Sequence, residues 1–256
     1  MAKIDNVLQE GILFNRKYLN RHGITNTAID YYLRSGKIEA ILHGLYRKPG
    51  PPLKWENIVY SLELMGHKVH VGHLSALSYH GLYHYLKLGP SSLDKIRLYS
   101  SSQLPTWVNN LDLYPKFLLM KQNPFLENYT GTTEIPFGTW DWPIKYSTAE
   151  RAFIESVSTV KTEEEIIELK LMVEGAVNLR PKLLQQLLEE CHNIKAKRLF
   201  LYLAREVAHP WYNYLDLTKI DLGSGKRQIV QGGVLDPEFL ITVPKEVNSG
   251  QENSIF

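Results

Sequence analysis

The sequence predicts an α+β protein with a small N-terminal domain and a larger C-terminal one, and three patterns support this fold class. Residues 23–50 change periodicity twice, from turn residues to a helical pattern and then to an alternating one. Residues 95–146 contain short strand-like runs separated by Pro, Gly and Asn, and mainly helical patterns follow them. Strands followed by helices are typical of an α+β domain.

Length and composition are those of a globular protein. The chain has 256 residues and 44% hydrophobic content, enough for one large domain or two ordinary ones. Its apolar runs are far shorter than the ~20 residues that span a bilayer, and the first residues lack the apolar segment of a secretory signal. The single cysteine, Cys191, excludes an internal disulfide, and its apolar neighbours predict a buried side chain. These features predict a cytoplasmic protein.

Positive charge is concentrated near the N-terminus. The formal net charge is +2, but residues 1–50 contain eight Lys or Arg against four Asp or Glu. That segment carries a surplus of four positive charges, and the rest of the chain a surplus of two negative charges. A basic segment on a near-neutral body is a modest electrostatic signal for a polyanionic partner.

Residues 26–35 are predicted to form a helix with one apolar face. Thr25 supplies a capping hydroxyl at its start, and Gly36 is well placed to end it. At 100° per residue, one stripe collects the apolar side chains, which are those of Ala28, Ile29, Tyr32 and Leu33. Such a stripe predicts packing on a core.

A shorter helix is predicted just upstream. Asn15 can cap it, Tyr18 and Leu19 are its core-facing candidates, and Gly23 ends it. Two short helices separated by a Gly-containing turn indicate a helix-turn-helix, in which the second helix enters the major groove of DNA.

A β-hairpin is predicted to follow the second helix. Residues 38–42 and 45–48 are strand-like and are joined by His43 and Gly44, so a tight turn there would form the wing of a winged helix. Basic residues at its ends could reach phosphates, namely Lys37, Arg47 and Lys48.

Base contacts are expected from the exposed face of the 26–35 helix. Arg34 is the strongest candidate because a guanidinium can bridge the two acceptors of guanine. Asp30 lies on the same face, where a carboxylate would repel phosphates, so we expect it to accept from a cytosine amine or to face away from the duplex. The expected DNA-binding residues are Arg16, Lys17, Thr25, Asn26, Thr27, Tyr31, Arg34, Lys37, His43, Arg47 and Lys48. The alternative is a helix-hairpin unit that only packs against its neighbour or docks a protein.

Two more helices are predicted before a break in the chain. Residues 54–66 and 73–81 have helical spacing, and Gly, Pro and Ser interrupt the pattern at residues 87–95. The predicted domains are therefore a winged helix-turn-helix at 1–92 and a C-terminal domain at 93–256.

The C-terminal domain is predicted to begin with strands. The strand-like runs are KIRLYS, KFLLM, TTEIPF and PIKYS. Ser147 with Glu150 and Thr162 with Glu165 have the spacing of capping boxes that start helices. Further helices are expected from Pro181 and over residues 194–208, and strand-like signals return at RQIV and EFLITVP.

Three sequence motifs give only weak support for a phosphate-binding, metal or nuclease site. GSGKR, residues 223–227, lacks the first glycine and the final hydroxyl of a phosphate-binding loop, so a Gly-rich hairpin turn is favoured over an anion contact. His80 and His84 would share a helix face only if that helix runs past Gly81, and no carboxylate or cysteine completes a metal site nearby. The nuclease-like ELK, residues 168–170, falls in a predicted helix and not on a strand.

No catalytic residue, metal or cofactor is therefore expected. A second basic group is more often a solvated surface but could bind RNA or a toxin, and it comprises Lys195, Lys197, Arg198, Lys226 and Arg227.

Several segments resemble one known family. GITNTAIDYYLRSGKIEAILHGLYRKPG and GHLSALSYHGLYHYL are similar to the N-terminal winged-helix module of the AbiEi-type antitoxins. YSTAERAFIESV, AKRLFLYLAREVAHPWY and LDLTKIDLGSGKRQIVQGG resemble landmarks of the C-terminal domain of that family. The resemblance covers nearly the whole chain, and separated motifs in the right order are more specific than any one of them.

The resemblance implies a non-enzymatic antitoxin of a bacterial toxin-antitoxin pair that acts in phage defence by abortive infection. The N-terminal domain would bind inverted operator repeats and repress its own operon, and the C-terminal domain would counter a nucleotidyltransferase toxin. Direct contact with the toxin does not follow, and a monomer in solution could bind DNA cooperatively. The competing hypotheses are an enzyme acting on nucleic acid or nucleotides through GSGKR, and a protein-docking adaptor.

Overall fold

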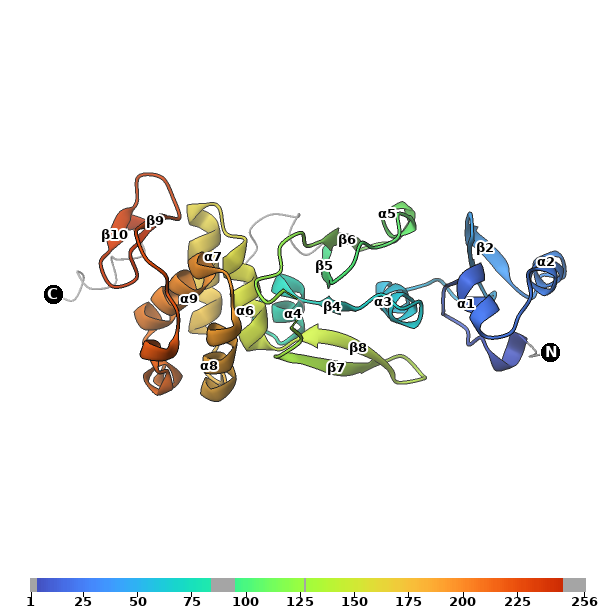
Figure 1. Cartoon of the computed structure of the whole chain (residues 1–256), viewed down its shortest axis with the longest axis horizontal. Coiled ribbons are helices and arrows are strands. Elements are labelled where there is room, and N and C mark those ends of the chain that lie inside the picture. Colours follow the sequence, from blue (N-terminus) through green and yellow to red (C-terminus); the bar gives the residue numbers. More distant parts are fainter. Residues whose placement is uncertain (1–3, 84–94, 127, 246–256) are drawn as a thin grey trace. The chain divides into compact units, whose positions relative to one another are not determined.

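The computed structural model describes residues 4–83, 95–126 and 128–245 (Figure 1). The expected domain boundary at 92/93 and His84 lie outside these residues. The described chain forms two compact units. Unit 1 comprises Met1–His70, Gly89–Leu119 and Glu134–Lys145, and unit 2 comprises Val71–Leu88, Met120–Thr133 and Tyr146–Phe256. Each unit is therefore assembled from several separate stretches of sequence.

A winged helix-turn-helix begins unit 1, as the sequence predicts. After the 3-10 helix η1 (Ile4–Asn6), its elements are β1 (Phe14–Asn15), α1 (Arg16–Arg21), α2 (Asn26–Arg34), β2 (Glu39–Leu42) and β3 (Leu45–Arg47). The three strands form an antiparallel sheet in the order β1-β3-β2. The β2–β3 turn carries Gly44 at φ +75°, a left-handed conformation that glycine adopts without steric cost.

Both predicted helix starts are confirmed. The backbone N–H of Tyr18 donates to the Asn15 side chain (2.8 Å), and that of Ala28 donates to the Thr25 hydroxyl (3.3 Å). The apolar stripe of α2 packs on a core cluster to which Leu19, Ile29 and Tyr46 belong. Burial of this stripe fixes which face of α2 remains exposed.

A five-stranded sheet with the order β6-β5-β4-β8-β7 follows the winged helix. Its strands are β4 (Val69–Val71), β5 (Lys95–Ser100), β6 (Lys116–Leu119), β7 (Thr132–Phe137) and β8 (Trp142–Ser147). Four of these strands match the predicted runs, whereas β4 was not expected. The helices among these strands are α3 (Trp55–Leu64), α4 (His73–Tyr79) and α5 (Trp107–Asn110), and the first two confirm the helices predicted near 54–66 and 73–81.

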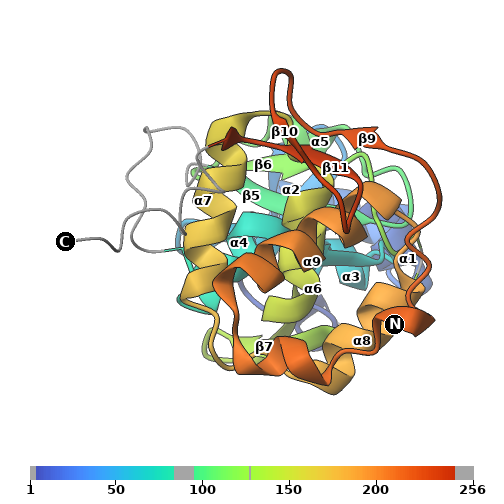
Figure 2. The same ribbon diagram turned by 90° about the vertical axis from the view of Figure 1, so that its left-hand side faces the viewer.

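Four helices dominate unit 2, namely α6 (Ala149–Ser158), α7 (Glu163–Glu174), α8 (Pro181–Glu190) and α9 (Ile194–Val207). Helix α6 packs against α4, α8 and α9, and Figure 2 shows α6 beside α9. The core between them contains Phe153, Phe200 and Trp211, whose neighbouring ring centroids lie 6.2 to 6.3 Å apart. Cys191 is buried, as its apolar neighbours predict.

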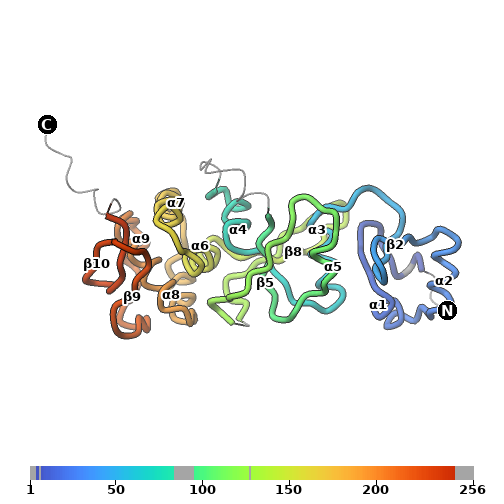
Figure 3. Tube along the Cα trace, turned by 90° about the horizontal axis from the view of Figure 1, so that it is seen from above, coloured from blue at the N-terminus to red at the C-terminus, as the bar shows by residue number. Residues whose placement is uncertain are grey.

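The end of the described chain packs against α9. Two 3-10 helices, η2 (Pro210–Tyr214) and η3 (Leu217–Lys219), precede β9 (Arg227–Gln228), β10 (Val234–Asp236) and β11 (Ile241–Val243). These strands form a small sheet in the order β10-β11-β9, seen beside α9 in Figure 3. No helix of the described residues is long and apolar enough to cross a membrane.

Two local predictions in unit 2 are wrong. The GSGKR segment does not form a hairpin turn, because β9 pairs in parallel with β11 and not with an adjacent antiparallel strand. Ser147 and Glu150 do not form a capping box, because Thr148 precedes α6 and the Ser147 hydroxyl donates to Glu155 instead. The capping box of Thr162 and Glu165 at the start of α7 is confirmed.

Candidate functional site

The exposed face of α2 presents polar and aromatic side chains at helical spacing. Thr27, Tyr31 and Arg34 all lie on this face, and Tyr31 is 58% exposed. The opposite side of the helix holds Ile29, which is fully buried. Side chains at this spacing, on a second helix anchored by its apolar stripe, can reach base edges in a major groove.

Asp30, in the middle of this face, is paired within the protein. Arg16 Nη2 lies 2.5 Å from Asp30 Oδ1, and Arg16 Nε donates to the Tyr46 hydroxyl at 3.1 Å. The pKa of Arg16 is raised, chiefly by the hydrogen bond to Asp30 and next by that to Tyr46. The carboxylate therefore has a cationic partner, which neither of our two sequence-based alternatives foresaw.

The basic residues at the wing are also engaged. Arg47 Nε donates to Glu39 at 2.6 Å, and its terminal nitrogens donate to the carbonyl oxygens of Pro51 (3.0 Å) and Gly50 (3.4 Å). Lys48 Nζ lies 3.1 Å from an Asp5 carboxylate oxygen. Arg47 therefore fastens β2 to β3 and to the segment that leaves the wing.

Three of the predicted basic DNA-binding residues are exposed and form no ion pair among the described residues: Lys17, Arg34 and Lys37. Arg34 Nε donates to the backbone oxygen of Asp30 at 3.3 Å. The Lys37 ammonium lies 5.7 Å from the centroid of the Tyr32 ring, a cation–π distance. Thr25, Asn26 and His43 are exposed too.

The second predicted basic surface is not one surface. Lys197 and Arg198 are buried at 2% and 1% exposure, because both lie on the inward side of α9. Arg198 donates to the carbonyl oxygens of Leu222 (2.7 Å) and Gly225 (2.6 Å), so it holds the GSGKR loop in place. This corrects our expectation for these two residues.

The other three members of that group differ among themselves. Lys195 donates to the Val160 carbonyl oxygen, and burial lowers the pKa of its ammonium. Lys226 and Arg227 are exposed. Of the five predicted residues, only Lys226 and Arg227 therefore have exposed side chains.

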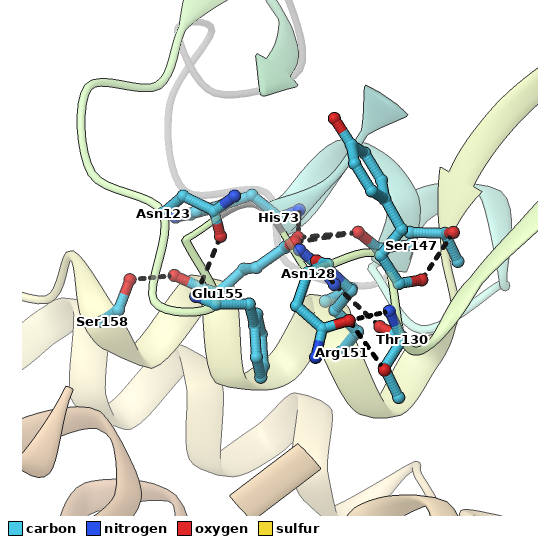
Figure 4. A network of polar contacts seen from close by, with 12 residues as sticks. His73, Asn123, Asn128, Thr130, Ser147, Arg151, Glu155 and Ser158 are labelled. Carbon is cyan, nitrogen blue, oxygen red and sulfur yellow. Dashed lines mark hydrogen bonds and ion pairs between the residues drawn. The ribbon is translucent and has the colours of Figure 1, made fainter. Parts of the chain in front are cut away.

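The YSTAERAFIESV segment forms a buried polar network, shown in Figure 4. Arg151 and Glu155 lie one turn apart on α6, and both side chains have 0% exposure. Their Nε and Oε1 atoms are 2.8 Å apart. The Ser147 hydroxyl donates to Glu155, and so does the backbone N–H of His73 at 2.9 Å. A buried carboxylate is tolerated when a cation and further donors surround it in this way.

Arg151 also joins α6 to the loop before β7. Its Nη1 donates to the carbonyl oxygens of Asn128 and Thr130, both at 2.7 Å, and its guanidinium lies 4.4 Å from the Phe125 ring centroid. At the start of the helix Glu150 accepts from Arg180 at 2.9 Å. The polar residues of this segment are thus structural cross-links within unit 2.

Our reading of the sequence missed this network. Its signal was present, because Arg151 and Glu155 lie four residues apart and enclose Ala152, Phe153 and Ile154. An opposite-charge pair within an apolar stretch of helix indicates a buried ion pair rather than a solvated surface.

His73 and His80 both hydrogen-bond to protein groups. His73 Nδ1 accepts a hydrogen bond from the Leu74 N–H, so this nitrogen carries no proton. The proton of the neutral ring is then on Nε2, which donates to the Thr159 hydroxyl at 2.7 Å. His80 donates to the Ser147 carbonyl oxygen at 2.9 Å. In the part of the chain that the structure describes, no group of three or more His, Cys, Asp or Glu could hold a metal ion. Glu168 and Lys170 lie within α7, as predicted.

Two family models match the chain. Residues 1–88 match the model described as "Transcriptional regulator, AbiEi antitoxin N-terminal domain". Residues 94–244 match the one described as "Transcriptional regulator, AbiEi antitoxin, Type IV TA system". No curated protein matches the chain.

Among solved structures, the crystal structure of the RV2827C protein from Mycobacterium tuberculosis is similar in fold. It has a TM-score of 0.53 and 14% sequence identity, and the match covers 91% of this chain and 86% of that one. At this identity the likeness concerns the fold alone.

Proposed function

Because the chain belongs to the AbiEi antitoxin family, the transcriptional regulators of type IV toxin-antitoxin systems, we propose that it binds operator DNA through its winged helix. By this binding it represses its own operon, and through its C-terminal domain it counters a nucleotidyltransferase toxin. The functions divide at residues 92/93, close to the point where the two family models meet. The protein acts without catalysis of its own.

The exposed face of α2 carries this proposal. Thr27, Tyr31 and Arg34 project from a helix whose opposite stripe is buried, so the helix can enter a major groove without losing its packing. Arg34 reads a guanine, because its guanidinium matches the two acceptors on that base edge.

The residues around α2 bind the DNA backbone. Lys17 and Lys37 neutralise phosphates, and Thr25, Asn26 and His43 hydrogen-bond to them. Arg47 and Lys48 contribute less, because each must first exchange an ion pair with Glu39 or Asp5 for a phosphate.

The partners are operator DNA with inverted repeats and the toxin. Two copies of a monomeric chain bind the repeats cooperatively. Neutralisation of the toxin needs no stable complex with it. Lys226 and Arg227 are two exposed cations of unit 2 that an RNA or an acidic partner would meet.

Operator binding by the full chain tests the proposal. Fluorescence anisotropy is measured with DNA from upstream of the operon of the protein, over a range of salt concentrations. Arg34→Ala should weaken binding by about 1 to 3 kcal/mol and relax base preference at one position, whereas Lys37→Ala should weaken all sequences alike. Arg227→Ala, far from α2 in sequence, serves as the control and should leave operator binding unchanged.

Two results would contradict the proposal. The first is unchanged operator affinity when Lys17, Arg34 and Lys37 are all replaced by Ala. The second is the absence of any salt-sensitive DNA affinity in the unaltered chain, which is the result that a protein-docking adaptor predicts.

A further inference from the structure

We infer that Arg16 is a positioning residue of the DNA-binding surface: it cancels the charge of Asp30 and fixes α2 against α1 and β3, and it does not contact DNA itself. This inference rests on the proposed binding of DNA by α2. It replaces the expectation, based on the sequence, that Arg16 contacts the DNA backbone.

Asp30 presents an electrostatic problem to a helix that enters a major groove. It lies on the exposed face of α2, three residues after Thr27 and four before Arg34. Electrostatic screening extends over ~8 Å at physiological ionic strength, so phosphates that line the groove would lie within range of the carboxylate. An uncompensated Asp30 would therefore oppose the docking that its neighbours favour.

Arg16 solves this problem from another element. It is the first residue of α1, and its Nη2 lies 2.5 Å from Asp30 Oδ1. Charge-assisted hydrogen bonds of this length are stronger than neutral ones. The pair is half exposed, at 38% for Arg16 and 52% for Asp30, so its value lies in cancelling charge more than in stabilising the fold.

A second contact fixes the guanidinium. Arg16 Nε donates to the hydroxyl of Tyr46 at 3.1 Å, and the Arg16 Cζ atom lies 5.8 Å from the Tyr46 ring centroid. Tyr46 belongs to β3 and to the buried core of the winged helix. Arg16 thus joins α1, α2 and β3, and two of its nitrogens are already occupied.

The adjacent residue provides a matched control. Lys17 is also basic and lies at the same end of α1, but its side chain is exposed and forms no ion pair within the described residues. If Arg16 acts through Asp30, the effect of replacing Arg16 on DNA affinity must depend on whether Asp30 is present. If Lys17 contacts phosphate directly, the effect of replacing Lys17 must not depend on Asp30.

The test compares Arg16→Gln, Asp30→Asn, the double variant and Lys17→Gln in the full chain. Operator affinity is measured by anisotropy at several KCl concentrations. Arg16→Gln should lower affinity about tenfold, and the double variant should return to within about twofold of the unaltered chain. The double variant should also keep the original dependence of log K on log[KCl], because it removes a pair of zero net charge. Lys17→Gln should reduce that slope by about 0.9, the loss of one phosphate contact.

Three results would overturn the inference. If the double variant stays as weak as Arg16→Gln and its slope also falls by about 0.9, Arg16 contacts phosphate directly. If Arg16→Gln binds as the unaltered chain does, Asp30 needs no partner. If the unaltered chain shows no salt-dependent operator binding, the proposed function itself fails, and this inference fails with it. Circular dichroism melting of each variant separates these results from unfolding, because an exposed pair contributes only about 0 to 1 kcal/mol to stability.

Discussion

Replacing Arg151 by methionine should destabilise unit 2 more than any single change on the surface of the protein. The substitution keeps most of the aliphatic volume of the side chain but removes its charge. Glu155 would then remain fully buried without its cationic partner, although the Ser147 hydroxyl and the His73 N–H still donate to it. We therefore expect unit 2 to lose the favourable interaction between Arg151 and Glu155 while the carboxylate of Glu155 remains buried and desolvated.

The expected loss is about 3 to 5 kcal/mol, the usual cost of removing one partner of a buried ion pair. The carbonyl oxygens of Asn128 and Thr130 also lose their donor, but these residues are exposed or half-buried and water can replace it. Domains are typically stable by about 5 to 15 kcal/mol, so the loss is a large part of the total. Arg151→Met with Glu155→Gln should cost less than Arg151→Met alone, because no buried charge remains.

Hydrogen exchange at increasing urea concentrations provides the assay, because each peptide reports the unfolding midpoint of its own segment. Peptides from α6 and α9 should unfold at lower urea in Arg151→Met, whereas the midpoint of α2 should stay where it is. Lys116→Met is the control, since Lys116 and Asp112 form an exposed ion pair at the same spacing of four residues. Its cost should stay within about 1 kcal/mol.

The reasoning fails on either of two observations. One is a loss of less than about 1 kcal/mol in Arg151→Met, the range of an exposed pair. The other is a double variant that is less stable than Arg151→Met, because this would show that the charge of Glu155 is not the cause of the loss.

Three further predictions concern unit 2. Thr162→Ala should lower stability by about 1 kcal/mol in urea denaturation through loss of the cap of α7, and an unchanged midpoint would contradict this. Gly131→Ala should lower the free energy of unfolding by more than about 1 kcal/mol, because Gly131 has φ +71° and a new Cβ would lie 3.1 Å from a Leu187 methyl group. A variant as stable as the unaltered chain would disprove the close packing. Burial alone would raise the pKa of Glu150, but the hydrogen bonds from Arg180 outweigh burial, so the pKa is lowered. The Glu150–Arg180 pair therefore stabilises the protein fully above the ordinary glutamate pKa of about 4.3, and this stabilisation is lost as the pH falls through the lowered pKa. Glu150→Gln should therefore flatten the acid limb of a stability-against-pH curve, and an identical limb would exclude the pair as its source.

The winged helix was predictable because its signals are local. Asn15 and Thr25 cap helices within three residues of themselves, and Gly44 meets the requirement of a two-residue turn. The apolar stripe that contains Ile29 follows directly from helical geometry. Each of these features is decided by neighbours in sequence, so the fold and the exposed face of α2 could be derived without a structure.

The partners of charged residues were not predictable, because they are set by contacts between distant parts of the sequence. Asp30 forms an ion pair with Arg16 across the turn between two helices, and Arg198 donates to carbonyl oxygens more than twenty residues away in sequence. Ser147 had the spacing of a cap but donates to Glu155, since the tertiary network offers a stronger acceptor. The parallel pairing of β9 with β11 likewise joins segments that are not adjacent in sequence, and β11 packs against α9.

The division of the chain into interleaved units has a consequence for how it can be cut. The path passes between unit 1 and unit 2 after His70, Leu88, Leu119, Thr133 and Lys145. Both fragments made by a single break at 92/93 therefore contribute to the folding of both units. A break there would leave β4 in one fragment and both of its sheet neighbours, β5 and β8, in the other, so the five-stranded sheet could form only if the two fragments associate.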